Sequence, residues 1–145
     1  MTNHTFKELR LINHTGRELQ LMLENRKPLS MFYADADQKE DERIIPRKKF
    51  DRYVKLGRFQ SAERTFEVAY DPRTKRPHRV KYVLYCLKGE EWRLKAMLLV
   101  LKISRCVTSY DEGLDRIESA LLGYTDEEIE KLKRAIKRSS ESKAV

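Results

Sequence analysis

The segment from Val80 to Leu87 constrains the fold most, because the strand that it predicts is apolar on both faces. Its two parities are Val80, Tyr82, Leu84 and Cys86 on one side and Val83, Tyr85 and Leu87 on the other. Such a strand is typical of the centre of a sheet that is covered on both sides. The segment from Phe59 to Tyr70 predicts a second strand, which pairs with the first as an antiparallel hairpin. The tip of this hairpin is the basic Pro72–His78 segment.

Helix-start and helix-stop signals divide the rest of the chain. Three capping boxes, in which Ser or Thr is followed three residues later by Glu, begin at Thr15, Ser109 and Thr125. The first predicts a helix from Gly16 to about Arg26 that ends before Pro28, and the other two predict a C-terminal helical hairpin. Further signals predict a strand over Leu29–Ala34, an acidic loop over Asp35–Glu42, and a helix between Pro46 and Gly57.

The segment from Glu90 to Ser104 is open to two interpretations, because an apolar run does not by itself distinguish a helix from a strand. Its residues are good helix formers, so we expect a helix, with a third strand as the alternative. The helix would have two apolar faces and would lie between two layers. This predicts that Leu98, Leu99 and Leu101 are buried and that Trp92 anchors the core.

The fold class that these elements predict is α+β, with a small, mainly antiparallel sheet covered by helices and a C-terminal helical hairpin. A chain of 145 residues with 40% hydrophobic residues can build one real core. We therefore expect a single globular domain over residues 1–138, followed by a frayed tail over residues 139–145.

The cellular setting follows from two absences in the sequence. It contains no apolar run long enough to span a membrane and no secretory signal pattern. Cys86 and Cys106 are both surrounded by apolar residues, and we expect both to be buried free thiols. The sequence therefore predicts a cytoplasmic protein without membrane contact.

The charge distribution gives the main functional indication. Residues 47–81 hold twelve basic and four acidic residues, a net of +8 that equals the formal charge of the whole chain. We expect the 46–57 helix and the 72–78 tip to bracket one strand and to form a single patch for an anionic partner. The candidate contact residues are Arg47, Lys48, Lys49, Arg52, Lys55, Arg73, Lys75, Arg76 and Arg79.

The search for catalytic groups gives only one weak pattern. His4, His14 and His78 lie in no nucleophile motif, and the isolated glycines form no phosphate-binding loop. Asp71 before a strand and Glu91 after it resemble the acid pair of restriction-type, metal-dependent nucleases, with Arg93 where lysine is expected. We thus predict no catalytic residue, no metal and no cofactor.

Three functional hypotheses remain, in order of preference. The first is a small, non-enzymatic protein that binds nucleic acid without sequence specificity, through phosphate contacts of the 47–81 region. The second is a regulatory factor, an inhibitor or adaptor, that docks on an acidic protein surface. The third is the metal-dependent nuclease. Steep salt dependence of nucleic-acid binding separates the first from the second.

Overall fold

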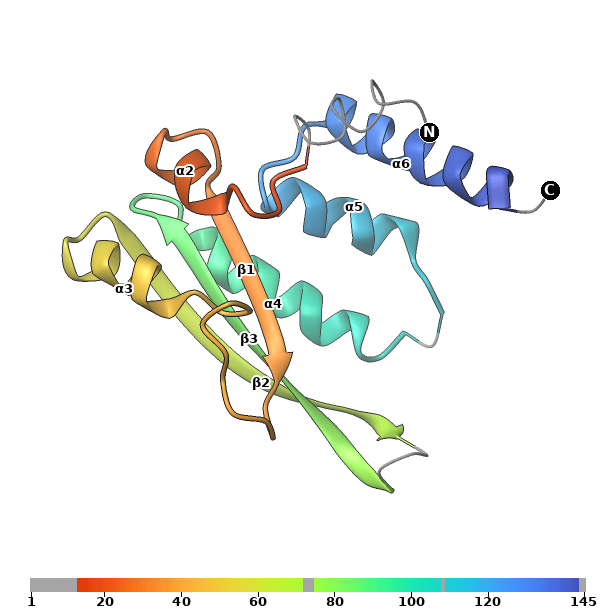
Figure 1. Cartoon of the computed structure of the whole chain (residues 1–145), viewed down its shortest axis with the longest axis horizontal. Helices are drawn as coiled ribbons and strands as arrows, with labels where there is room; N and C mark the ends of the chain where they lie inside the picture. Colours follow the sequence, from red (N-terminus) through yellow and green to blue (C-terminus); the bar gives the residue numbers. More distant parts are fainter. Residues whose placement is uncertain (1–12, 72–74, 108, 144–145) are drawn as a thin grey trace.

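The computed structural model describes residues 13–71, 75–107 and 109–143. Its middle layer is a three-stranded antiparallel sheet of β1 (Leu29–Asp35), β2 (Phe59–Asp71) and β3 (Arg76–Leu87). β3 lies in the centre, as its doubly apolar sequence predicted, and β1 and β2 are the two edges (Figure 1). The hairpin of β2 and β3 is longer than predicted, because β3 already begins at Arg76.

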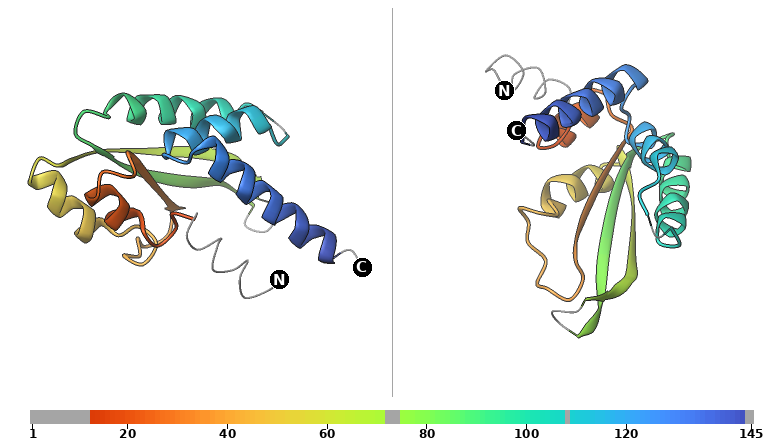
Figure 2. Two further views of the ribbon diagram at one scale, coloured as in Figure 1. Left: turned by 90° about the horizontal axis from the view of Figure 1, so that it is seen from above. Right: turned by 90° about the vertical axis from the view of Figure 1, so that its right-hand side faces the viewer.

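Helices cover both faces of this sheet. α2 (Glu18–Leu23) and α3 (Arg47–Lys55) lie on one face, and α4 (Trp92–Ser104) and α5 (Glu112–Leu121) lie on the other (Figure 2). α6 (Asp126–Lys143) follows α5 across a short turn and runs back along it as the C-terminal helical hairpin. The predicted α+β fold class is therefore confirmed.

The two helices of the hairpin are joined by ion pairs between charged side chains. Glu112 of α5 lies 2.5 Å from Lys133 of α6, and Arg116 of α5 pairs with Glu130 of α6. α6 extends to Lys143, past the domain boundary expected after residue 138, while residues 144–145 lie outside the described part. None of the helices in the described ranges has the length and apolar character needed to cross a bilayer.

Alternate side chains of β3 enter two separate cores. Val83 and Tyr85 face α2 and α3, while Leu84 and Cys86 face α4 and α5. The first core also contains Met22, Ile45, Phe50 and Phe59, and the second also contains Leu29, Leu94, Met97, Val100, Leu101 and Leu121. A strand that is buried on both faces cannot alternate apolar with polar residues, which is why this segment is apolar throughout.

The end of α5 packs against the segment that leads into β1. Lys27, which is only 2% exposed, donates from Nζ to the carbonyl oxygen of Leu122 at 2.7 Å. Arg93 donates from Nη1 to the carbonyl oxygens of Ala120 and Leu121, at 3.2 and 3.0 Å. Carbonyl groups at the end of a helix lack the N–H groups of a following turn, and they form the negative end of the helix dipole. Two cations therefore stabilise this end of α5 and hold it on the sheet.

Gly123 allows this close approach. Its φ of +93° lies in the region that favours glycine. A Cβ atom added here would lie 2.5 Å from Cδ of Pro28, which is too close for any side chain. The turn between α5 and α6 thus requires glycine both for its backbone conformation and for its contact.

Three helices end in the same way, with a residue of positive φ just beyond the last turn. These residues are Asn25 after α2, Gly57 after α3 and Gly123 after α5, and the backbone hydrogen bonds of each are those of a Schellman motif. Gly57 was predicted as a helix stop. For α2 the predicted end at about Arg26 was too late, because the helix ends at Leu23 and Asn25, not Pro28, stops it.

The predicted capping boxes have different outcomes at the three helix starts. In the last, the Glu128 amide donates to the Thr125 hydroxyl and the Glu128 carboxylate accepts from the Thr125 amide, which confirms that box. α5 is capped by Asp111 and not by Ser109. α2 has no side-chain cap, so the prediction for Thr15 was wrong as well. Asp111 and Ser109 are only two residues apart, and the helix start in the folded chain decides which of them is the N-cap residue.

α4 confirms the helical interpretation of residues 90–104, but one of its sides faces outward. Leu101 is buried and Leu98 is half-buried. Leu99 is 58% exposed and Trp92 is 56% exposed, so the predicted burial of both was wrong. Trp92 stacks on the guanidinium group of Arg93 at 4.6 Å. The sheet covers one side of α4 and α5 covers another, so the remaining side faces solvent.

The two cysteines also differ in their environments. Both are free thiols. Cys86 is buried in β3, as predicted, and burial raises the pKa of its thiol to about 11. Cys106 is exposed, so its predicted burial was wrong. It lies just after the end of α4, where the apolar run no longer faces the sheet.

Replacement of Gly123 tests the contact between the α5–α6 turn and Pro28. We expect Gly123→Ala to lower the free energy of unfolding by about 2–4 kcal/mol, because it combines an unfavourable φ with a steric clash. Gly57→Ala is the matched control, since its φ is also positive but nothing lies within 4 Å of the added Cβ. It should cost only about 1 kcal/mol. Equal losses in urea unfolding would contradict the close packing at Gly123.

Truncation of α4 side chains tests which side of this helix is buried. Met97→Ala should lower the free energy of unfolding by about 2–5 kcal/mol, because Met97 is fully buried in the second core. Leu99→Ala should cost less than about 1 kcal/mol, because its side chain is mostly in water. A larger loss for Leu99 than for Met97 in chemical denaturation would show that α4 packs in another rotation.

Candidate nucleic-acid interface

α3 turns a row of cations away from the sheet. Pro46 is the N-cap residue of α3, directly before the first turn in which it was expected, and Phe50 packs in the core. Lys48, Arg52 and Lys55 lie on the opposite side of the helix and are exposed. Their spacing of four and three residues places them in one line of about 10 Å. We call these three residues, together with the exposed Lys49, the α3 cations.

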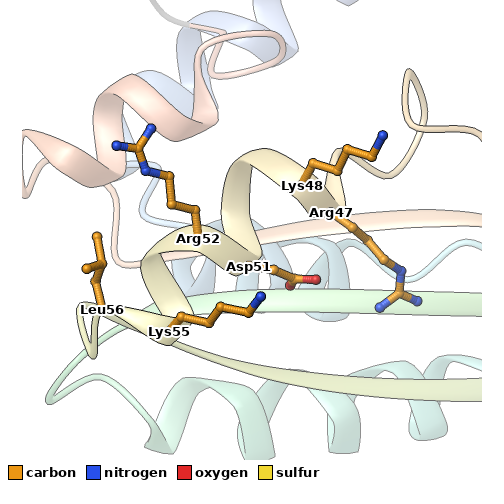
Figure 3. Close-up of a pocket in the computed structure, with 6 residues that line it drawn as sticks. All are labelled: Arg47, Lys48, Asp51, Arg52, Lys55 and Leu56. Atoms are coloured by element: carbon orange, nitrogen blue, oxygen red, sulfur yellow. The ribbon is translucent and has the colours of Figure 1, made fainter.

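An open hollow of about 570 Å³ lies beside these cations (Figure 3). Its lining residues are Arg47, Lys48, Asp51, Arg52, Lys55 and Leu56. Asp51, the acidic residue among them, accepts a hydrogen bond from the Tyr85 hydroxyl at 2.7 Å. Burial and this neighbouring carboxylate raise the pKa of Tyr85, so its hydroxyl remains a donor. The hollow is thus bordered mainly by positive charge.

Other cations of the basic segment are neutralised by acids from the loop after β1. Glu40 accepts from Nη2 of Arg47 at 2.9 Å and lies 2.6 Å from Nζ of Lys81. The hydrogen bonds from Arg47 and then Lys81 lower the pKa of Glu40 to about 2, against burial, which acts in the other direction. Arg79 pairs with Asp37 at 2.5 Å. Arg47, one of the candidate contact residues, is therefore half-buried and held in ion pairs with Glu40 and Glu63.

These ion pairs reduce the open positive charge of residues 47–81, to which the sequence assigned the whole excess charge of the chain. Loop residues that precede this segment fold onto it and cancel part of its charge. Within the described residues, no carboxylate lies within ion-pair distance of the α3 cations. One group of cations that remains open therefore lies on the outer side of α3.

The hairpin tip carries a second group of cations, far from the first. Lys75 and Arg76 are exposed, while Arg73 lies outside the described residues. α3 lies beside the start of β2, and the tip lies beyond its other end (Figure 1). The prediction of one continuous patch was therefore wrong. It assumed a short hairpin, whereas β2 runs for 13 residues, or about 40 Å.

The structure does not bring together the acid pair of the nuclease hypothesis. Asp71 ends β2 at the hairpin tip, and Glu91 follows β3 at the opposite end of the sheet. Arg93 is engaged with Glu90 at 2.8 Å and with the end of α5. Among the residues that the structure describes, no cluster of three His, Cys, Asp or Glu side chains could hold a metal ion.

An aromatic surface on the α4 side of the sheet was missed in the sequence. Of the aromatic residues near the basic segment, Phe59 and Tyr85 are buried. Tyr82 and Phe66 are only half-buried, and Tyr33 of β1 is 62% exposed. Alternation along the Leu29–Ala34 strand could have predicted which face of the sheet Tyr33 lies on. It could not have predicted that the helix covering this face stops short of Tyr33.

The remaining buried titratable groups form a structural cluster. The ring of His14 stacks on that of Tyr124 at 3.8 Å, and its Nδ1 lies 2.9 Å from Nζ of Lys27. Burial, and then the charge of Lys27, lower the pKa of His14 to about 4. Burial lowers the pKa of Lys27 to about 8. These groups join the segment before α2 to the α5–α6 turn and face no open surface.

Comparisons of this chain with protein-family models, with curated proteins and with solved structures find no match.

The His14 cluster predicts how stability depends on pH. An unfolded His14 takes up a proton near pH 6.5, whereas the folded protein resists protonation until about pH 4. The free energy of unfolding should therefore fall by about 1–2 kcal/mol between pH 7 and pH 5. His14→Gln, which stays neutral, should lack most of this slope in urea unfolding at the two pH values. An equal slope in both proteins would contradict the assignment.

Proposed function

We propose that this protein is a non-enzymatic, nucleic-acid-binding protein whose α3 cations contact phosphates. The observation that carries the proposal is the line of exposed Lys48, Arg52 and Lys55 beside an open hollow, without acidic partners in the described chain. Such a line can engage successive phosphates of one strand, and the charge of +8 draws polyanions to the molecule.

Helix stability does not account for these cations. Arg52 and Lys55 lie in the last turn of α3, where positive charge is favourable to the helix dipole. Lys48 and Lys49 lie in the first turn, where the same dipole opposes positive charge. The sequence of this turn has no acidic residue, and the Glu42 carboxylate, which accepts from the Lys48 amide at 3.0 Å, offsets only part of the effect. Their presence at an unfavourable end supports a role in binding.

The mode of binding follows from the residue types. Lysine and arginine on a helix exterior reach phosphate oxygens, which carry no sequence information. We therefore propose binding without marked base preference. The proposal includes a cytoplasmic setting, which the two free thiols, Cys86 and Cys106, support. The alternative of docking on an acidic protein surface uses the same cations and is an outcome of the test below.

Replacement of the three aligned cations by alanine tests the proposal. The triple variant Lys48→Ala, Arg52→Ala and Lys55→Ala should bind a duplex oligonucleotide more weakly. The slope of log K against log salt should also decrease by up to about three, since each phosphate contact releases roughly one counterion. The measurement is a titration by fluorescence anisotropy at several salt concentrations.

The matched control removes the same charge elsewhere. Lys95, Arg134 and Arg138 are exposed on α4 and α6, and their replacement by alanine should leave the slope nearly unchanged. An equal effect of both triple variants would mean that only net charge matters and that α3 is not the interface. A parent protein that binds no nucleic acid at about 100 mM salt would reject the proposal in favour of the acidic protein partner.

A further inference from the structure

On the face of the sheet that α4 covers, the row of residues that contains Tyr33 is only partly covered. In register, Tyr33 of β1 lies opposite Tyr82 of β3, and Tyr82 lies opposite Arg64 of β2, so that all three side chains share one face. The preceding row on this face, with Leu84 at its centre, belongs to the core under α4. α4 ends at Ser104, and the row that contains Tyr33 lies beyond its main contact.

The aromatic rings of this region touch one another across all three strands. The ring centroid of Tyr82 lies 5.6 Å from that of Tyr33 and 5.9 Å from that of Phe66. Arg105, at the end of α4, lies 5.5 Å from the Tyr82 ring and 5.6 Å from the Phe66 ring. We call Tyr33, Tyr82, Phe66, Arg64 and Arg105 the aromatic surface.

Packing explains only part of this arrangement. Arg105 donates to the Tyr82 hydroxyl at 2.7 Å and so fastens the end of α4 to the sheet. Tyr33 is 62% exposed, although its ring lies next to that of Tyr82. Arg64 is exposed and, in the described chain, forms no ion pair. The exposed Tyr33 ring thus lies next to Tyr82, and the guanidinium groups of Arg64 and Arg105 lie on the other side of Tyr82 or over its ring. Aromatic rings and arginines gathered on one face are the composition of a surface on which bases stack.

We propose that the aromatic surface stacks unpaired bases of single-stranded nucleic acid, an inference that rests on the nucleic-acid binding proposed above. A base packs on the open face of Tyr33, and the Arg64 and Arg105 guanidinium groups attract the adjoining phosphates. Asp35 shares this face and lies 3.7 Å from Nδ1 of His78, on the side of Tyr33 that is away from α4 and from Arg105. Bases within a duplex cannot stack in this way.

The test uses three probes: an oligodeoxythymidylate, an abasic oligomer with the same number of phosphates, and the duplex of the oligodeoxythymidylate with its complement. The parent should bind the single strand more tightly than the abasic oligomer, by about fivefold to a hundredfold, the range for stacking of one base. Equal affinity for the single strand and its abasic counterpart would overturn the inference.

Variants of Tyr33 locate the effect on the aromatic surface. Tyr33→Ala should lose most of the preference for the single strand over the abasic oligomer and leave duplex affinity unchanged. Tyr33→Phe keeps the ring and should keep the preference. Tyr110→Ala is the matched control, because Tyr110 is also an exposed tyrosine, 75% exposed, on the segment between α4 and α5. A loss of preference in the control, or none in Tyr33→Ala, would place the stacking site elsewhere and reject the inference.

The same titrations separate the two proposals. Duplex binding with a steep salt slope but no preference for bases would keep the proposed function and reject stacking. Absence of binding to all three probes would reject both. Preference for bases that depends on Tyr33 would support the aromatic surface, whether or not the α3 cations also contribute.

Discussion

The fold depends on two cations, Lys27 and Arg93, at the carbonyl end of α5. They come from opposite ends of the sheet sequence, before β1 and after β3, and they meet at one helix terminus. Removing Lys27 from water is costly, and its carbonyl acceptor and the helix dipole offset that cost. Because Gly123 allows the turn to approach Pro28, these contacts fix α5, and with it α6, on the sheet.

Electrostatics within the molecule divides its positive charge into paired and open groups. The loop after β1 supplies Asp37 and Glu40, which neutralise Arg79, Arg47 and Lys81 on the face that α3 leaves uncovered. These pairs act as the polar cover of that half of the sheet. Glu42 of the same loop accepts from the Lys48 amide at 3.0 Å, but within the described residues the charged groups of the α3 cations form no ion pair. Their field therefore extends into solvent, where it can act on a polyanion.

A mismatch of length between helix and strand creates the aromatic surface. α4 has 13 residues and spans about 20 Å, whereas the hairpin beneath it spans about 40 Å. α4 therefore covers only the part of its face near the β3–α4 turn. Tyr33, Tyr82 and Phe66 lie where the cover ends, and Arg105 at the last turn of α4 partly shields two of them. The α3 cations and the aromatic surface lie on opposite faces of the sheet.

The sequence by itself determined the elements and their layers. The doubly apolar β3 segment required a central strand, Gly57 and the Thr125 capping box marked helix ends, and the residues from Glu90 on favoured a helix. These features depend on neighbouring residues along the chain, whose periodicity is visible in one dimension. Only the tertiary structure decided which side of α4 faces water, which acid meets which base, and how far apart α3 and the hairpin tip lie. Each of these depends on distances between segments that are remote in sequence, and a strand 13 residues long separates charges that a count along the chain places together.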